Sequence, residues 1–103
     1  MLRWRVGDVT VTRVMDDEFE LLVPQDERTA AAVLADASWL APWAITDDGT
    51  LRIGSSATLI ESQGRRIVVD PWLAFDPPDA DRLLDALAQA GCKADDVDVV
   101  VNT

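Results

Sequence analysis

The chain has 103 residues, of which 49% are hydrophobic and 27% are charged, a composition typical of one globular domain. Its formal net charge of −10 argues against binding to nucleic acid or to an anionic membrane surface, because both need clustered Lys and Arg. No stretch approaches the about 18 apolar residues that a membrane span requires, and no signal peptide is visible.

The cysteine and histidine content limits the chemistry further. The sequence contains one cysteine, Cys92, and no histidine. A lone cysteine cannot form an internal disulfide, so a cytoplasmic location is expected. Without histidine, the chain alone cannot build a Ser-His-Asp triad, a Cys-His pair or an imidazole metal site. We therefore expect no catalytic residue and no metal ligand within it.

The first predicted element is a β-hairpin. Apolar residues alternate with arginines at the start of the chain, which is the pattern of a half-buried strand: Leu2, Trp4 and Val6. Gly7-Asp8 supplies the turn, and a return strand begins at Val9. The alternation slips at Arg13-Val14, which indicates a bulge or the end of the strand.

Residues 16–49 carry weaker signals. The acidic run at Asp16 lacks the spacing and the glycine of a calcium loop, so a solvated face is favoured. Asp26 is a predicted N-cap for a short surface helix over residues 27–35. Trp39 and Trp43 lie in a loop with Pro42, and residues 47–49 (Asp-Asp-Gly) predict a turn.

The middle of the chain predicts three strands. The first covers residues 50–53 and is broken by Gly54-Ser55, and the second covers residues 57–61. A hairpin loop at residues 62–64 leads to a third strand over residues 65–69, whose Ile-Val-Val run predicts burial on both faces. This strand ends at Asp70-Pro71.

The last third predicts a βαβ-like unit. Asp79 is the expected N-cap of a helix that runs to about Ala90, and Gly91 occupies the position typical of a helix C-terminus. A strand follows over residues 98–101. One face of the helix is expected to be buried: Ala80, Leu83, Leu84, Leu87 and Ala88.

Three segments together resemble the metallo-β-lactamase-fold hydrolases. Residues 7–14 (GDVTVTRV) are similar to the opening hairpin of that family. Residues 59–61, the Gly64-Arg65-Arg66 turn and residues 67–70 (IVVD) are similar to the hairpin that ends in its first conserved aspartate. Residues 83–87, Gly91 and residues 95–103 (DDVDVVVNT) are similar to its first helix and the following strand.

The resemblance implies an α+β fold, the N-terminal half of an αββα sandwich with a mostly antiparallel sheet and one or two covering helices. Residues 1–103 then form a single partial domain that ends immediately before the family's HxHxDH motif. For a full-length protein, the resemblance implies two metal ions, usually zinc, and hydrolysis of an ester, lactone, amide or phosphoester by metal-bound hydroxide. Asp70 is followed by Pro71-Trp72 where relatives often carry Thr-Gly, which leaves the subfamily open.

The same resemblance assigns candidate site residues. Asp70 would support the metal-binding loop as a hydrogen-bond acceptor, although a strand-ending residue that satisfies turn amides is the simpler reading. Asn102 and Thr103 would sit at the mouth of that loop. Candidate pocket walls, for which plain packing is at least as well supported, are Trp72, Leu73, Phe75, Trp39 and Trp43. Cys92 has only Lys93 beside it and is expected to be inert.

Two other readings of the sequence remain open. The chain could be a non-catalytic scaffold that binds a partner through an exposed sheet face, or an unrelated small α+β domain. The expected partners are the remainder of the same fold or another subunit at that face, with a homo-oligomer as one form, and a small-molecule substrate for the full-length protein.

Overall fold

A computed structural model describes residues 1–21, 23–71 and 77–103. Its helices are α1 (Glu27–Ala37) and α2 (Pro77–Gln89), and short 3-10 helices cover Ser38–Leu40 and Ala94–Asp96. None of the helices in these ranges is long and apolar enough to cross a membrane. The strands are β1 (Leu2–Val6), β2 (Val9–Leu21), β3 (Leu51–Ser62), β4 (Arg65–Val69) and β5 (Val99–Val101).

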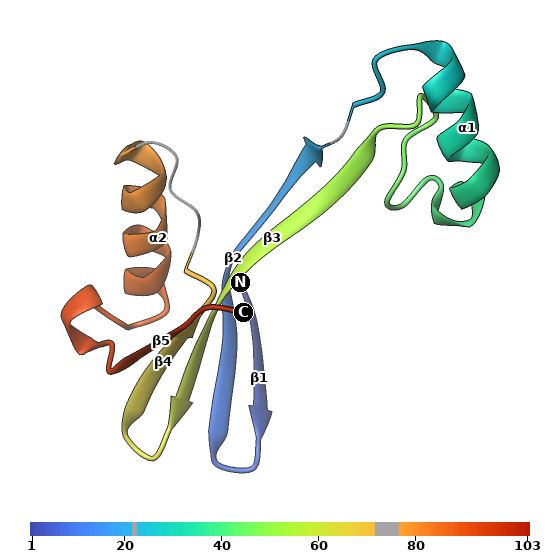
Figure 1. Cartoon of the computed structure of the whole chain (residues 1–103). Coiled ribbons are helices and arrows are strands. Elements are labelled where there is room, and N and C mark those ends of the chain that lie inside the picture. The colour runs from blue at the N-terminus through green and yellow to red at the C-terminus, as the bar shows by residue number, and fades with distance from the viewer. Residues whose placement is uncertain (22, 72–76) are drawn as a thin grey trace. The chain divides into compact units, whose positions relative to one another are not determined.

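The five strands form one sheet in the order β1-β2-β3-β4-β5. The β1–β2 and β3–β4 pairs are antiparallel, and only β4 and β5 are parallel. Helix α2 connects these two parallel strands, as a crossover connection requires (Figure 1). The predicted α+β class, with its hairpins and its βαβ-like unit, is therefore confirmed.

The chain divides into two compact units. The first contains Met1–Asp16 and Ser55–Thr103, and the second contains Asp17–Gly54. The two long strands, β2 and β3, run through both units. The hairpins and α2 belong to the first unit, and α1 belongs to the second.

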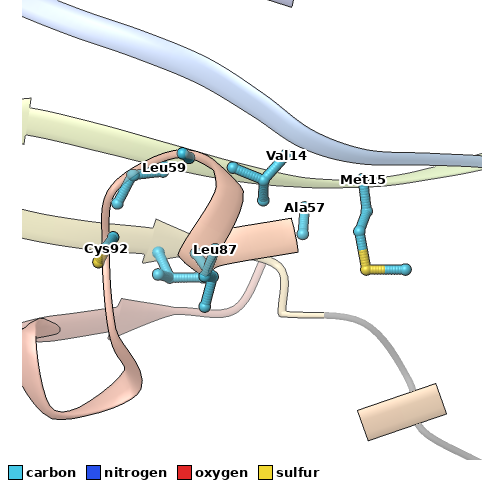
Figure 2. Close-up of a cluster of buried hydrophobic side chains, with 8 residues drawn as sticks. Val14, Met15, Ala57, Leu59, Leu87 and Cys92 are labelled. Carbon is cyan, nitrogen blue, oxygen red and sulfur yellow. The ribbon is translucent and has the colours of Figure 1, made fainter. Parts of the chain in front are cut away.

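The core of the first unit lies between the sheet and α2. Leu59 on β3 and Val68 on β4 are directly paired, and both are buried. Leu87 of α2 packs against them, and Figure 2 shows its side chain beside those that come from β2 and β3. The full buried cluster is Val14, Met15, Ala57, Leu59, Val68, Leu87, Ala90 and Cys92.

Helix α2 differs from its prediction in its start and in its buried face. It begins at Pro77, so Asp79 lies in the first turn and not at the N-cap. Proline is favoured there because the first helical residues have no intrahelical partner for their N–H groups. The face turned to the core is Leu83, Ala86, Leu87 and Ala90, whereas Leu84, Ala80 and Ala88 are exposed.

The end of α2 is as predicted. Gly91 has a φ of +84°, and its N–H donates to the carbonyl of Ala88 at 2.9 Å. The N–H of Cys92 donates to the carbonyl of Leu87 at 2.9 Å, which completes a Schellman motif. Cys92 therefore reaches the core as the residue that closes the helix, and burial raises the pKa of its thiol.

The opposite face of the first unit's sheet is not covered by any other described element of that unit. The guanidinium of Arg3 donates to the hydroxyl of Thr12 and to the carbonyl of Ala90, so both side chains lie on the α2 side. Alternation then places Leu2, Trp4 and Val6 on the other side, where they are exposed and not half-buried as expected. We define the uncovered face as Leu2, Trp4, Val6, Val9, Val11, Ile60, Ile67, Val69, Val99 and Val101.

Strands β2 and β3 both continue through the positions where the sequence predicted an interruption, so neither strand ends there. Strand β2 continues past Arg13-Val14 to Leu21, although the consecutive residues Val14 and Met15 both enter the buried cluster and so interrupt its alternation. Strand β3 runs through Gly54-Ser55. Neither glycine nor serine lacks a backbone N–H, so both residues can remain in a ladder of hydrogen bonds. On β4, Val68 is buried, while Ile67 and Val69 are half-buried.

The second unit is built around α1 and the turn before β3. Asp26 is the N-cap of α1, as predicted, because its carboxylate accepts from the N–H of Thr29 at 2.7 Å. Half-buried residues on α1 have helical spacing: Ala30, Val33, Leu34 and Ala37. The predicted turn at residues 47–49 is also present, and Gly49 has a φ of +79°.

Candidate functional site

The candidate site lies where β4 and β5 end. These strands are parallel neighbours, so their carboxyl ends meet at one edge of the sheet, where ligand sites of open α/β sheets commonly occur. Asp70 follows β4 directly, and Asn102 and Thr103 follow β5. The structure thus brings together the three residues that the sequence analysis assigned to support of a metal-binding loop.

Asp70 joins the two strand ends through its backbone and its side chain. Its N–H donates to the carbonyl of Val101 at 2.8 Å. Its carboxylate accepts from the N–H of Thr103 at 2.7 Å and from the Thr103 hydroxyl at 2.5 Å. We call the last two bonds the Asp70–Thr103 pair, which holds the end of one strand to the end of the other.

The backbone of Asp70 is in the left-handed region, with a φ of +50°. Aspartate is one of the few residues other than glycine that visits this region. The conformation turns the chain sharply at the end of β4. The Asp70 carboxylate bonds Thr103, which lies 33 residues further along the chain.

Hydrogen bonding sets the ionisation of Asp70. The hydroxyl and then the N–H of Thr103 lower the pKa of the Asp70 carboxyl below its ordinary value of 3.8. Both groups donate to the ionised form and favour it. The carboxylate is therefore charged at neutral pH, with each of its two oxygens engaged by Thr103.

The candidate pocket walls have different outcomes. Trp72, Leu73 and Phe75 lie outside the described residues. Trp39 and Trp43 belong to the second unit, where 77% and 82% of their surfaces are exposed. Such exposure is unusual for tryptophan, which normally buries most of its ring.

Two cavities occur elsewhere in the described chain. One of about 490 Å³ belongs to the second unit and lies between α1 and the turn at residues 47–50. The other, of about 330 Å³, lies at the hairpin turns of the first unit, beside Asp8 and Gly64. Asp70 and Thr103 line neither of them.

The residues present do not fit a zinc site. Among the described residues, no group of three or more Cys, Asp, Glu or His side chains is placed to hold a metal ion. The whole sequence lacks histidine. A tetrahedral zinc site needs three or four protein ligands, so no step of a metal-dependent reaction can be assigned to this chain's residues.

One contact at the opposite end of the parallel strands was missed by the sequence analysis. The N–H of Arg66 donates to the carboxylate of Asp98 at 2.8 Å, and the N–H of Asp98 donates to the carbonyl of Arg66 at 2.8 Å. Arg66 had been read only as part of a hairpin turn. No local signal reveals the pairing, because 32 residues separate its members.

Comparisons with known proteins show which fold this is. No family model matches the sequence, and no curated protein matches it. Among solved structures, the hydrolase AbOPH of the beta lactamase superfamily matches with a TM-score of 0.63 and 19% identity over 97% of this chain. AidC, a dizinc quorum-quenching lactonase, matches with a TM-score of 0.59 and 16% identity over 98% of this chain.

The likeness concerns the fold and only part of each neighbour. The chain spans about a third of their length, since 34% of each of those two chains is covered. The predicted resemblance is confirmed at the level of fold: the chain has the fold of the N-terminal portion of a metallo-β-lactamase-fold hydrolase.

Proposed function

We propose that this chain forms the first structural portion of a metal-dependent hydrolase that cleaves esters, lactones or amides. The observation that carries the proposal is the Asp70–Thr103 pair, at the carboxyl ends of two parallel strands in this particular fold. Both structural neighbours are hydrolases, and one of them is a dizinc lactonase.

In this proposal Asp70 is a positioning residue. Its carboxylate holds the backbone and the hydroxyl of Thr103, and so orients the polypeptide that leaves β5. Carboxylates that orient metal-binding segments commonly affect metal affinity without contacting the ion. Asn102 directly follows β5 and precedes Thr103 in the sequence.

The proposal places the zinc ligands outside these 103 residues. They would come from the remainder of the same fold, in the same polypeptide or in another subunit. The substrate pocket would then be completed by that polypeptide, with Trp72, Leu73 and Phe75 as proposed walls. Cys92 is free and buried, which agrees with a reducing, cytoplasmic setting.

The uncovered face supports the need for such a remainder. Exposed members of this face include Leu2, Trp4 and Val6 at one edge of the sheet, and Val99 and Val101 at the other. Contiguous apolar surface of this kind marks an interaction site in soluble proteins. We propose that the rest of the fold, or a second subunit, packs on this face.

The deciding experiment uses the polypeptide that the whole coding region encodes. Sequencing past the Thr103 codon, metal analysis and assays with lactone, ester and amide substrates are combined with Asp70→Ala and Asp70→Asn. We expect bound zinc, hydrolysis, and a loss on the order of 10- to 100-fold in metal affinity or activity for Asp70→Ala. The exposed Asp95→Ala is the matched control.

Two results would overturn the proposal. The first is a purified, folded protein that binds no metal and hydrolyses none of these substrates. The second is an active enzyme in which Asp70→Ala behaves as Asp95→Ala does, which would remove the positioning role and leave only the fold.

A further inference from the structure

Strand β5 is too short to define its own register. It has three residues, all exposed, and it pairs with β4 on one side only. A parallel pair is slightly less stable per residue than an antiparallel one, so a ladder of three residue pairs constrains the register of β5 only weakly. Something beyond the Ile67–Val99, Val68–Val100 and Val69–Val101 ladder must hold β5 in place.

The missing constraint is found at the start of the ladder. Arg66 precedes Ile67, the first residue of β4 that pairs with β5, and Asp98 precedes Val99, the first residue of β5. The backbone N–H of Arg66 donates to the Asp98 carboxylate, and the Asp98 N–H donates to the Arg66 carbonyl, both at 2.8 Å. Both backbone polar groups of Arg66 are thereby engaged by Asp98, the residue that precedes β5.

The guanidinium of Arg66 also forms ion pairs with residues of two further elements. It lies 3.6 Å from the carboxylate of Glu61 on β3 and 3.2 Å from that of Asp96 in the 3-10 helix before β5. The Asp96 carboxylate also accepts from the N–H of Lys93 at 3.0 Å. Arg66 therefore fixes the segment that enters β5 against the strand on the far side of β4.

The geometry of β5 shows how a change of register at its start would move Thr103 at its end. A slip of two residues preserves the face of each side chain but moves β5 by about 6.6 Å, given about 3.3 Å per residue. The Thr103 N–H lies 2.7 Å from the Asp70 carboxylate, so such a slip would abolish the Asp70–Thr103 pair. A slip of one residue would turn every β5 side chain to the other face.

We propose that Arg66 and Asp98 are positioning residues for the candidate site: they set the register of β5 and thereby deliver Thr103 to Asp70. The two pairs bracket the ladder, with Arg66–Asp98 at its start and Asp70–Thr103 at its end. The functional value of this arrangement rests on the proposed hydrolase function, whereas the register itself does not.

The first test measures Thr103 and Asp70 directly by NMR, with no metal and no turnover. Asp98→Ala removes the acceptor for the Arg66 N–H, whereas Asp98→Asn keeps one carbonyl oxygen there. For Asp98→Ala we expect Thr103 amide exchange to accelerate on the order of tenfold or more while the amides of Leu59 and Val68 keep their protection. We also expect the pKa of Asp70 to rise toward 3.8, and Asp98→Asn to restore both readouts.

The controls separate register from general damage. Asp95→Ala removes an exposed carboxylate three residues earlier, and Arg65→Ala removes the neighbouring guanidinium for comparison with Arg66→Ala. If Asp98→Ala fails to fold, Arg66→Ala carries the test, since it retains the backbone bonds and loses only the guanidinium contacts. Unchanged Thr103 exchange and an unchanged Asp70 pKa in folded Asp98→Ala or Arg66→Ala overturn the proposal, as does equal loss of protection at every core amide.

A second test concerns the active full-length protein. There we expect Asp98→Ala to lower kcat by up to about 100-fold with little change in KM, because small displacements of reacting groups cost rate. Asp98→Asn should recover most of kcat. A hydrolase whose NMR readouts shift but whose kcat does not would remove the functional role of the register, whereas absence of any hydrolysis would count against the proposed function alone.

Discussion

Gly49 shows how a single backbone position holds the second unit together. A Cβ at this residue would lie 3.0 Å from the Ala30 Cα and 3.1 Å from the Ala30 carbonyl oxygen, both on α1. The turn before β3 therefore rests against the helix backbone with no room for a side chain. The sequence identified this glycine as a turn residue, but the contact with α1 depends on tertiary packing that no local pattern encodes.

Replacement of Gly49 by alanine should be more damaging than the same change at Gly91. Both have positive φ values, +79° and +84°, so both variants incur a backbone cost of roughly 1–2 kcal/mol. Only Gly49 adds a clash, because a Cβ at Gly91 meets nothing within 4 Å. Urea unfolding followed by tryptophan fluorescence measures the difference, and equal losses for the two variants would contradict the packing argument.

Leu59 is the core residue whose truncation should cost most in the first unit. It is fully buried between Val68 and Leu87. We expect Leu59→Ala to lower the free energy of unfolding by about 2–5 kcal/mol, because transfer and cavity terms add. Leu84→Ala is the matched control, since Leu84 is 45% exposed and its loss should cost no more than about 0.5 kcal/mol. Similar costs at both leucines would show that the core lies elsewhere.

At the scale of elements, two interruptions predicted from the sequence lie at or close to the boundaries between the two compact units, although neither of them ends a strand. The predicted interruptions at Arg13-Val14 and at Gly54-Ser55 do not end the strands, since β2 and β3 run through them. One boundary between the two compact units falls after Asp16, close to the first of these positions, and the other falls between Gly54 and Ser55, at the second. A loss of apolar alternation thus signals a change in what the strand packs against, while its backbone hydrogen bonds continue.

The buried face of α2 illustrates a second limit. Helical spacing allows two overlapping stripes on this alanine- and leucine-rich helix, one containing Leu84 and the other containing Ala86 and Ala90. The Schellman motif favours the stripe with Ala86 and Ala90, because it brings Cys92 into the core together with Leu87. The rotation of the helix follows from its end, which periodicity alone does not describe.

The cap of α1 should make this helix sensitive to acid. The N–H and the side chain of Thr29 lower the pKa of the Asp26 carboxyl below its ordinary value of 3.8. A depressed pKa in the folded state means that the ionised cap stabilises the helix above about pH 4, and that this contribution disappears as pH falls through the depressed value. We expect helical circular dichroism to decrease in that range.

Substitutions at Asp26 provide the matched comparison. Asp26→Ala should lower the helical signal at neutral pH, because the Thr29 N–H loses its acceptor. Asp26→Ser keeps an acceptor without a titrating group, so its helix content should be retained and its acid transition weakened. An unchanged acid transition in Asp26→Ser would assign it to other carboxylates, of which Asp48 also has a lowered pKa in this unit.

For the whole molecule, the sequence predicted which residues gather at the candidate site but not how they are held. The resemblance grouped Asp70 with Asn102 and Thr103, and the structure places Asp70 and Thr103 at the ends of two parallel strands. The two hydrogen bonds between them, and the Arg66–Asp98 pair that positions them, join residues 32 or 33 apart. Such contacts follow from strand register, and register is a property of the assembled sheet.

The uncovered face should determine how the isolated chain behaves in solution. Because it presents apolar side chains on all five strands of the first unit's sheet, the isolated 103-residue chain should bind the dye ANS and associate with itself.

Trp4→Lys with Val101→Lys places a charge on each edge of this face without touching the buried cluster, so ANS fluorescence and the sedimentation coefficient should fall while circular dichroism is kept. Leu84→Lys, an equally exposed apolar site on α2, is the control. If Leu84→Lys reduces association as strongly as the paired lysines do, the chain does not associate through the sheet face. The argument that a further layer of polypeptide packs on this face would then lose its support.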